Sequence, residues 1–133
     1  MSIRNLDCLF QPRSVAVIGA SDREGSVGAL VMRNLIEAGF AGPVWPVNPK
    51  HAQIAGREAW RDVAALPEVP DLAVVCTPAA TVPGLIEALG RKGTRAAVVL
   101  SAGLSAAKTK DGRTLQQAML DAARPYLLRV LGP

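Results

Sequence analysis

A short apolar run followed by spaced glycines constrains the fold of this chain more than any other feature. Residues 14–18 read SVAVI, a β-rich run too short for a helix, and Gly19, Gly25 and Gly28 interrupt the chain after it. From Val27 onward, apolar residues recur at helical spacing. A strand, a glycine loop and a helix in this order are typical of the start of a nucleotide-binding α/β unit. The glycines let the backbone approach a ligand closely, and the N–H groups at the helix start attract phosphate.

The glycine spacing is not the G-x-G-x-x-G fingerprint of dinucleotide-binding units. Ala20 follows Gly19, and five residues separate Gly19 from Gly25. An ordinary strand-to-helix turn would need glycine at the same places for backbone reasons alone. The loop by itself therefore leaves both phosphate binding and a plain turn open.

Apolar runs alternate with amphipathic segments along the rest of the chain. After the first strand we expect further strands at residues 44–47, 71–76, 95–100 and 127–131. We expect helices at residues 27–38, 81–92 and 115–122, and shorter helical turns at 6–10 and 61–66. This order predicts an α/β fold: a doubly wound, mainly parallel five-stranded sheet with helices on both faces, Rossmann-like in its connections.

Several residues make local predictions. Pro46 indicates an edge-like course for the second strand, because proline has no N–H to donate to the ladder of a neighbouring strand. Thr81 is placed to cap the helix that follows it. Cys76 ends an apolar run typical of a strand covered on both faces, and is expected to be a small buried core residue. Leu6, Leu9 and Phe10 are expected to pack a short helical turn against the sheet.

Small residues follow each of the first four strands. In parallel sheets the carboxyl ends of the strands carry the ligand site. We therefore expect the glycine loop, Asn48–Lys50, Thr77–Pro78 and Ser101–Gly103 to lie along one edge. In NAD-binding units the second strand ends in an acid that holds the ribose, whereas Lys50 offers a cation here. That favours a ligand with an extra phosphate on or near its ribose, although a plain surface lysine and an NADP site both remain open.

Composition narrows the classes of function. The chain has 15 basic and 11 acidic residues, scattered without a basic tract, so nucleic-acid binding is not expected. We find no apolar run of membrane-span length and no signal-peptide pattern, and predict a cytoplasmic protein with no membrane partner. Cys8 and Cys76 are isolated and indicate neither a disulfide nor a metal site. Since no triad, carboxylate pair or metal cluster emerges, we expect no catalytic residue in this chain.

A series of motifs resembles one known family. The segments LFQPRSVAVIGAS, GSVG, GPV-x-PVNPK, PDLAVVCTPA and the closing LGP are similar to the coenzyme A-binding domain of nucleoside-diphosphate-forming acyl-CoA synthetases. That group includes the α subunit of succinyl-CoA synthetase. The likeness covers nearly all of the chain and is greatest to fused proteins with an acyl-CoA synthetase-like region, some of which carry a GNAT-type lysine acetyltransferase.

The resemblance implies a role for each strand-end turn. It implies that the glycine loop faces the phosphates and pantetheine of CoA or acyl-CoA, that Lys50 meets the 3′-phosphate, and that two later turns line the pantetheine path. The residues implied are Gly19, Ser21, Gly25, Ser26 and Val27 in the loop, Asn48 and Lys50 in the second turn, and Thr77, Pro78, Ser101, Ala102 and Gly103 in the later turns.

The resemblance also implies partners that this sequence does not contain. Family members carry a phosphorylated histidine and an ATP-grasp region in further domains, and His51, the sole histidine, does not match the former. We therefore expect residues 1–133 to be a single CoA-binding domain, with 1–13 as a lead-in, forming the N-terminal part of a longer protein and not catalytic alone. An NAD(P)-binding oxidoreductase domain and a stand-alone CoA-sensing regulatory protein are the alternatives.

Overall fold

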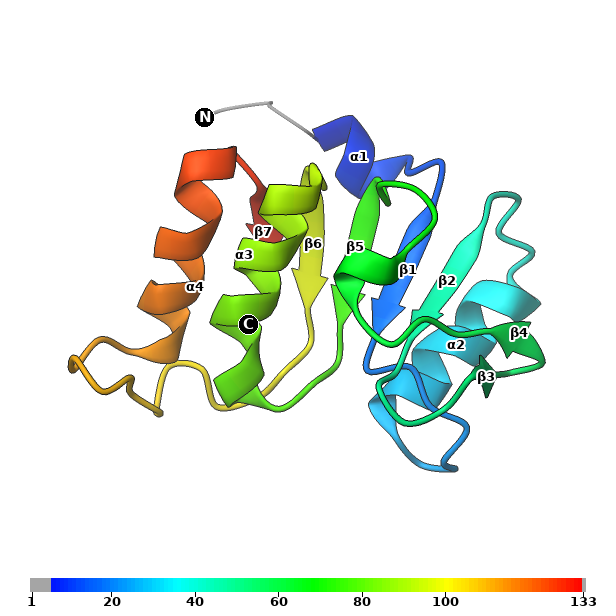
Figure 1. Ribbon diagram of the computed structural model, residues 1–133, viewed down its shortest axis with the longest axis horizontal. Coiled ribbons are helices and arrows are strands. Elements are labelled where there is room, and N and C mark those ends of the chain that lie inside the picture. Colours follow the sequence, from blue (N-terminus) through cyan, green and yellow to red (C-terminus); the bar gives the residue numbers. More distant parts are fainter. Residues whose placement is uncertain (1–5, 133) are drawn as a thin grey trace.

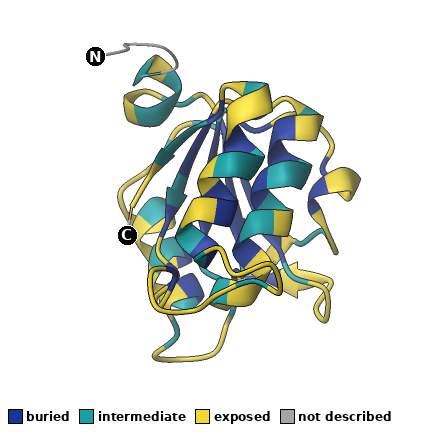
Figure 2. Ribbon diagram, turned by 90° about the vertical axis from the view of Figure 1, so that its left-hand side faces the viewer, coloured by how far each residue is buried: buried dark blue, intermediate teal, exposed yellow. Residues whose placement is uncertain are grey.

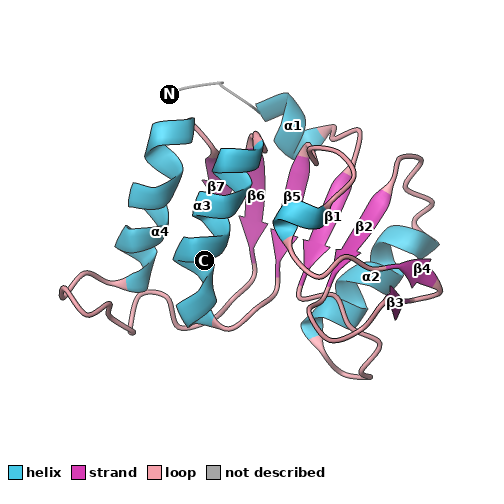
Figure 3. Cartoon of the chain, viewed as in Figure 1, coloured by secondary structure: helices cyan, strands magenta, loops and turns pink. Residues whose placement is uncertain are grey.

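Five short parallel strands form the centre of the computed structural model, which describes residues 6–132 (Figures 1 and 3). Residues 1–5 of the expected lead-in and Pro133 of the closing motif lie outside the described residues. The strands are β1 (Val15–Ile18), β2 (Val44–Val47), β5 (Leu72–Val75), β6 (Ala96–Val99) and β7 (Arg129–Leu131). Their order is β2-β1-β5-β6-β7, and every pair is parallel.

The strand order places a topological switch beside β1. The chain leaves β1 for β2 on one side and returns to β5 on the other. Connections that leave in opposite directions open a crevice at the carboxyl ends of the two central strands. The arrowheads of β1, β5 and β6 all point to the lower edge in Figure 3, and this edge carries the strand-end turns.

Helices cover both faces of the sheet, and strand residues alternate between two cores. Val15 and Val17 face a core shared with Met32 of α2 (Val27–Glu37), with the short helix α1 (Leu6–Phe10) at its side. Ala16 and Ile18 face the opposite core, which holds buried side chains of α3 (Val82–Lys92) and α4 (Leu115–Ala123). The buried strands between half-buried helices are visible in Figure 2. The predicted fold class is thus confirmed.

The predicted strands are all present, and the structure adds a hairpin. β3 (Gln53–Ile54) and β4 (Arg57–Glu58) pair antiparallel around Ala55 and Gly56, whose φ angles of 53° and 73° close a tight turn. Residues 61–66 contain only the short 3₁₀ helix η1 (Val63–Ala65), and two more such turns occur at η2 (Ala79–Thr81) and η3 (Arg124–Tyr126).

Four local predictions have different outcomes. Pro46 lies on the edge strand β2, as expected. Thr81 occupies the N-cap position of α3, but its hydroxyl makes no capping bond and donates instead to the Pro78 carbonyl oxygen at 2.7 Å, so that prediction is wrong. Phe10 is 71% exposed and does not pack on the sheet, because only Cys8 and Leu9 of α1 reach the core. Cys76 packs against that same core but is only half-buried, so the prediction of a fully buried core residue is wrong.

Candidate functional site

The ladder hydrogen bonds of the sheet continue past the strand ends and hold the turns together. The N–H of Gly19 donates to Val47 O at 3.0 Å, and that of Cys76 donates to Ile18 O at 2.8 Å. The N–H of Leu100 donates to Val75 O at 2.9 Å. The turns after β1, β2, β5 and β6 therefore start from one continuous edge.

Two glycines of the loop are required by close backbone contact. Gly19 has φ +89°, and a Cβ there would lie 3.0 Å from both the Cys76 carbonyl carbon and Thr77 Cγ2. A Cβ on Gly28 would lie 2.0 Å from Gly19 O. The first turn of α2 thus sits directly on the end of β1, and only glycine allows this approach. Gly25, by contrast, has φ +85° with open space around its Cβ position.

The start of α2 presents unpaired N–H groups. Ser26 is its N-cap: the Ser26 hydroxyl accepts from Ala29 N at 3.2 Å and donates to Arg23 O at 2.8 Å. Within residues 6–132, no acceptor is found for the N–H groups of Val27 and Gly28. Together with the positive end of the helix dipole, these two donors can bind an anion. The hydroxyl of Ser26, which the sequence places among the ligand contacts, is engaged in capping.

A hollow of about 420 Å³, here called the glycine-loop hollow, lies beside the first two turns of α2. Residues 22, 24–27, 29, 30 and 33 line it. Its charged side chains are Asp22, Glu24 and Arg33. The Asp22 carboxylate accepts from Ala55 N at 2.8 Å, which ties the loop to the β3–β4 turn. The Ser21 hydroxyl accepts from Arg23 N at 2.9 Å and shapes the same loop.

Asn48 joins the glycine loop to the turn that carries Lys50. Its side-chain N–H donates to Ala20 O at 2.9 Å. Its Oδ1 accepts from the backbone N–H of Lys50 at 2.7 Å and of His51 at 3.2 Å. One amide thereby fixes two turns relative to each other, which is a structural role for Asn48.

A second hollow, of about 450 Å³ and here called the Lys50 hollow, is lined by residues 48–52, 59–61 and 65. Lys50, His51 and Arg61 bring polar side chains to it, and Trp60 forms part of its wall. Lys50 and Arg61 are both exposed. No carboxylate is among the lining residues, so the surroundings favour a bound anion.

The third and fourth turns are linked by hydroxyl bonds. Ser101 is buried, and its hydroxyl donates to Thr77 O at 2.5 Å. The hydroxyls of Thr77 and Thr81 lie 2.7 Å apart. Ala102 and Gly103 are exposed, as is Pro78.

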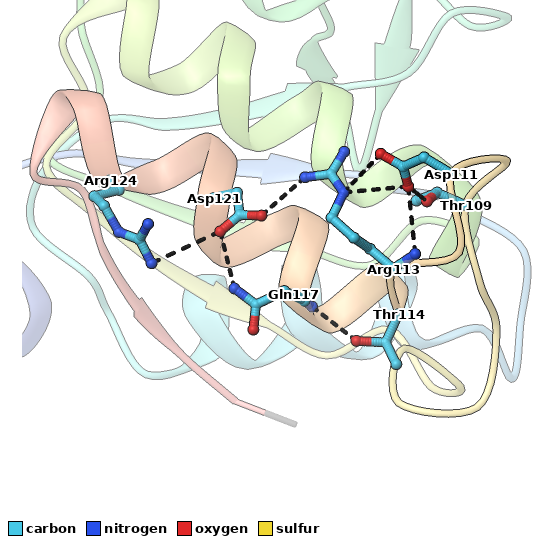
Figure 4. A network of polar contacts seen from close by, with 7 residues as sticks. All are labelled: Thr109, Asp111, Arg113, Thr114, Gln117, Asp121 and Arg124. Carbon is cyan, nitrogen blue, oxygen red and sulfur yellow. Dashed lines mark hydrogen bonds and ion pairs between the residues drawn. The ribbon is translucent and has the colours of Figure 1, made fainter.

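A polar network holds the segment between the fourth turn and α4 (Figure 4). Arg113 pairs with Asp111 at 2.9 Å and with Asp121 at 2.8 Å, and the Thr109 hydroxyl donates to Asp111. The hydrogen bond from Thr109, together with Arg113, holds the pKa of the Asp111 carboxyl below its usual range. The Gln117 side-chain N–H donates to Asp121 at 2.9 Å, and this bond, together with Arg113, lowers the pKa of Asp121. The Thr114 hydroxyl caps α4 by accepting from Gln117 N at 3.0 Å. The loop that follows Ser101–Gly103 is therefore anchored from its far end.

The structure brings part of the predicted set together. Gly19, Asn48, Thr77 and Ser101 form a continuous row through the contacts above. Gly25, Ser26 and Val27 line the glycine-loop hollow, while Ser21 lies outside it. Pro78, Ala102 and Gly103 line neither of the two hollows, and whether they contact a ligand remains a prediction.

Several lining residues of the two hollows escaped the sequence reasoning, and three of these matter for the arrangement of the site. They are Asp22, Trp60 and Arg61. Asp22 lies inside the predicted glycine loop but was not counted among its contacts, and no sequence signal places residues 60 and 61 beside Lys50. Only the pairing of residues 59–61 with the end of β2 shows that Trp60 and Arg61 lie beside Lys50.

Burial raises the pKa of the Cys76 thiol to about 11, which keeps it protonated near neutral pH. No group of three metal-ligating side chains was found within residues 6–132. In that same range no helix is long and apolar enough to cross a bilayer.

The chain belongs to the CoA binding domain family, whose sequence model matches residues 13–133. It is 39% identical over 133 residues to the alpha subunit of the ADP-forming acetate–CoA ligase I of Pyrococcus furiosus, covering 97% of this chain and 29% of that protein. It is 41% identical over 128 residues to the ADP-forming acetate–CoA ligase I of Archaeoglobus fulgidus, covering 96% of this chain and 18% of that protein.

A solved structure agrees with this assignment. The dinucleotide-forming acetyl-coenzyme A synthetase 1 of Ca. Korarchaeum cryptofilum superposes with a TM-score of 0.87 at 34% identity, over 96% of this chain and 27% of that one. The chain is thus a CoA-binding domain homologous to part of nucleoside-diphosphate-forming acyl-CoA synthetases, and the oxidoreductase and stand-alone regulator alternatives are not favoured. These three relatives give no support for a fused acetyltransferase.

Proposed function

We propose that this domain binds CoA or acyl-CoA along the carboxyl edge of its sheet and presents it to further domains of an ADP-forming acyl-CoA synthetase. The observation that carries the proposal is the hydrogen-bonded row from Gly19 through Asn48 to Lys50, in a chain of the CoA binding domain family. This row joins a helix N-terminus with two free N–H groups to a cationic hollow.

The two hollows suit different parts of the ligand. The N–H groups of Val27 and Gly28 suit the pyrophosphate, because backbone donors at a helix start bind phosphate oxygens. The Lys50 ammonium suits the 3′-phosphate on the ribose. Thr77 follows β5 and Ser101 follows β6, which lie about 10 Å and about 14 Å from β2 at ordinary strand spacing. The pantetheine arm can follow these turns toward a reacting centre elsewhere.

The thioester-forming steps belong, in this proposal, to other parts of a longer protein. The chain spans between about a fifth and a third of the length of the relatives described above. His51 lies on an exposed turn of the Lys50 hollow, and no base or nucleophile pair surrounds it among the described residues that line this hollow. We therefore expect binding without turnover.

Thermal unfolding with CoA, acetyl-CoA, NAD and NADP tests the proposal. CoA at one hundred times its Kd stabilises the folded state by about 2.7 kcal/mol, which should raise the Tm by roughly 10 °C. NAD and NADP at equal concentration should raise it far less. A larger shift with NADP than with CoA would refute CoA as the ligand. Formation of acetyl-CoA from ATP, acetate and CoA by this chain alone would refute the absence of turnover.

A further inference from the structure

Arg61 is brought to the Lys50 hollow by a strand-like pairing outside the five-stranded sheet. Trp60 N donates to Pro46 O at 2.9 Å, and Asn48 N donates to Trp60 O at 2.8 Å. Val47 and Trp60 form a parallel bridge. Residues 59–61 therefore run alongside β2 in the same direction, and Arg61 leaves this pairing at the carboxyl edge, where Lys50 also lies.

Pro46 makes this outer pairing compatible with the sheet. The carbonyl groups of Pro43 and Val47 face β1, since they accept from Val15 N at 3.1 Å and Gly19 N at 3.0 Å. Alternation along the strand turns Pro46 away from β1, and its carbonyl accepts from Trp60. The β1–β2 ladder therefore loses no hydrogen bond through the missing N–H of proline. Trp60 packs against the core and anchors the segment, so the position of Arg61 is well determined.

The cations of this hollow have no competing acid in contact. Lys50 and Arg61 are exposed, and within residues 6–132 no ion pair is found for either. The nearest acid in sequence, Asp62, accepts from Ala65 N at 2.9 Å as the N-cap of η1. Two uncommitted positive charges in one hollow are suited to a doubly charged phosphate monoester, whose three terminal oxygens can accept from both an ammonium and a guanidinium.

We propose that Arg61 is a second cation for the phosphate on the CoA ribose, and that it determines, together with Lys50, the preference for CoA over dephospho-CoA. This inference rests on the proposed function. Selectivity between CoA and dephospho-CoA distinguishes it from a general attraction of anions to the hollow. A guanidinium that binds the 3′-phosphate affects only ligands that carry this group, whereas a positive charge that merely attracts anions affects CoA and dephospho-CoA alike.

Calorimetric titration of the chain with CoA and dephospho-CoA at low salt tests this. We compare the wild type with Arg61→Ala, Arg61→Gln, Lys50→Ala and the Lys50→Ala/Arg61→Ala double variant. Arg57→Ala is the matched control, because Arg57 is an exposed arginine on β4 that does not line the hollow. Thermal unfolding of each variant without ligand checks the fold, and Arg61→Gln keeps most of the aliphatic packing if the alanine variant is unstable.

The wild type should prefer CoA. Arg61→Ala and Arg61→Gln should weaken CoA binding about fivefold and dephospho-CoA binding less than about twofold, and the double variant should lose the preference. Arg57→Ala should change both ligands equally and by less than about twofold. If the Arg61 variants keep the wild-type preference, or weaken both ligands equally, the inference is overturned while the proposed function stands. If the wild type does not bind CoA at all, the proposed function fails first.

Discussion

The two hollows at the carboxyl edge differ in the kind of group they offer to an anion. The glycine-loop hollow offers the backbone at the start of α2, where Val27 lines it, with Asp22 and Glu24 also on its lining. The Lys50 hollow offers side-chain cations and no carboxylate. Backbone donors are placed by the fold itself, whereas side-chain cations can be changed without disturbing it. We therefore expect variants of the first hollow to affect stability or all CoA-like ligands, and variants of the second to affect selectivity.

Gly28→Ala should have the strongest effect, and it should act on folding. Its Cβ would lie 2.0 Å from Gly19 O, so α2 must move away from β1. We expect a loss of about 3 kcal/mol of stability, measured by denaturant unfolding. The control is Gly84→Ala in α3, where nothing lies within 4 Å of the new Cβ and alanine should be neutral or stabilising. Unchanged stability of Gly28→Ala would show that the contact of α2 with β1 is not essential.

The main elements of the fold were predictable because local signals agree with the tertiary structure. The apolar runs at 72–75 and 96–99 are buried on both sides, and glycines end α2 and α3 at positive φ. The β3–β4 hairpin was missed because its strands have two residues each, too few for any periodicity. The capping prediction for Thr81 failed because η2 directly precedes α3, so that Thr81 has helical φ and ψ and its hydroxyl turns back to Pro78.

The site was predictable only where it lies on strand ends. Gly19, Asn48, Thr77 and Ser101 follow strands that the sequence predicts, and parallel pairing then brings them to one edge. Arg61 depends on a bridge between Val47 and Trp60 that no local pattern announces. The capping role of Ser26 was equally hidden, because a serine before a helix fits both a cap and a phosphate contact.

Gly25→Val should weaken ligand binding more than folding. Its φ of +85° disfavours a branched side chain, but the space around its Cβ is open, so the folding loss should stay at about 1–2 kcal/mol. The side chain would stand at the glycine-loop hollow, in front of the α2 start. We expect CoA and dephospho-CoA affinity to fall alike, on the order of thirtyfold, or ~2 kcal/mol, because both ligands carry the pyrophosphate.

Gly112→Val is the matched control for that measurement. Gly112 has φ +89° and nothing within 4 Å of its Cβ position, and it lines neither hollow. It should lose similar stability and keep wild-type affinity. If both glycine variants bind CoA equally well by calorimetry, the requirement for glycine at position 25 is conformational and the glycine-loop hollow does not hold the pyrophosphate.

Lys50→Ala should change affinity less than Gly25→Val does, and only for ligands with the ribose phosphate. A charge-assisted hydrogen bond contributes roughly 1.5–3 kcal/mol when shielded from water. Lys50 is exposed, and solvent screening should reduce this by about half, which corresponds to a loss of about tenfold for CoA. The difference between wild type and variant should shrink as salt is raised, since screening weakens the ammonium–phosphate attraction but not the backbone contacts of the other hollow. Lys110→Ala removes the same charge from an exposed loop that lines neither hollow, and should bind both ligands as the wild type does.

Equal weakening of CoA and dephospho-CoA by Lys50→Ala would mean that the two hollows do not divide the ligand as proposed. The ammonium would then act on the pyrophosphate that the glycine loop was expected to hold.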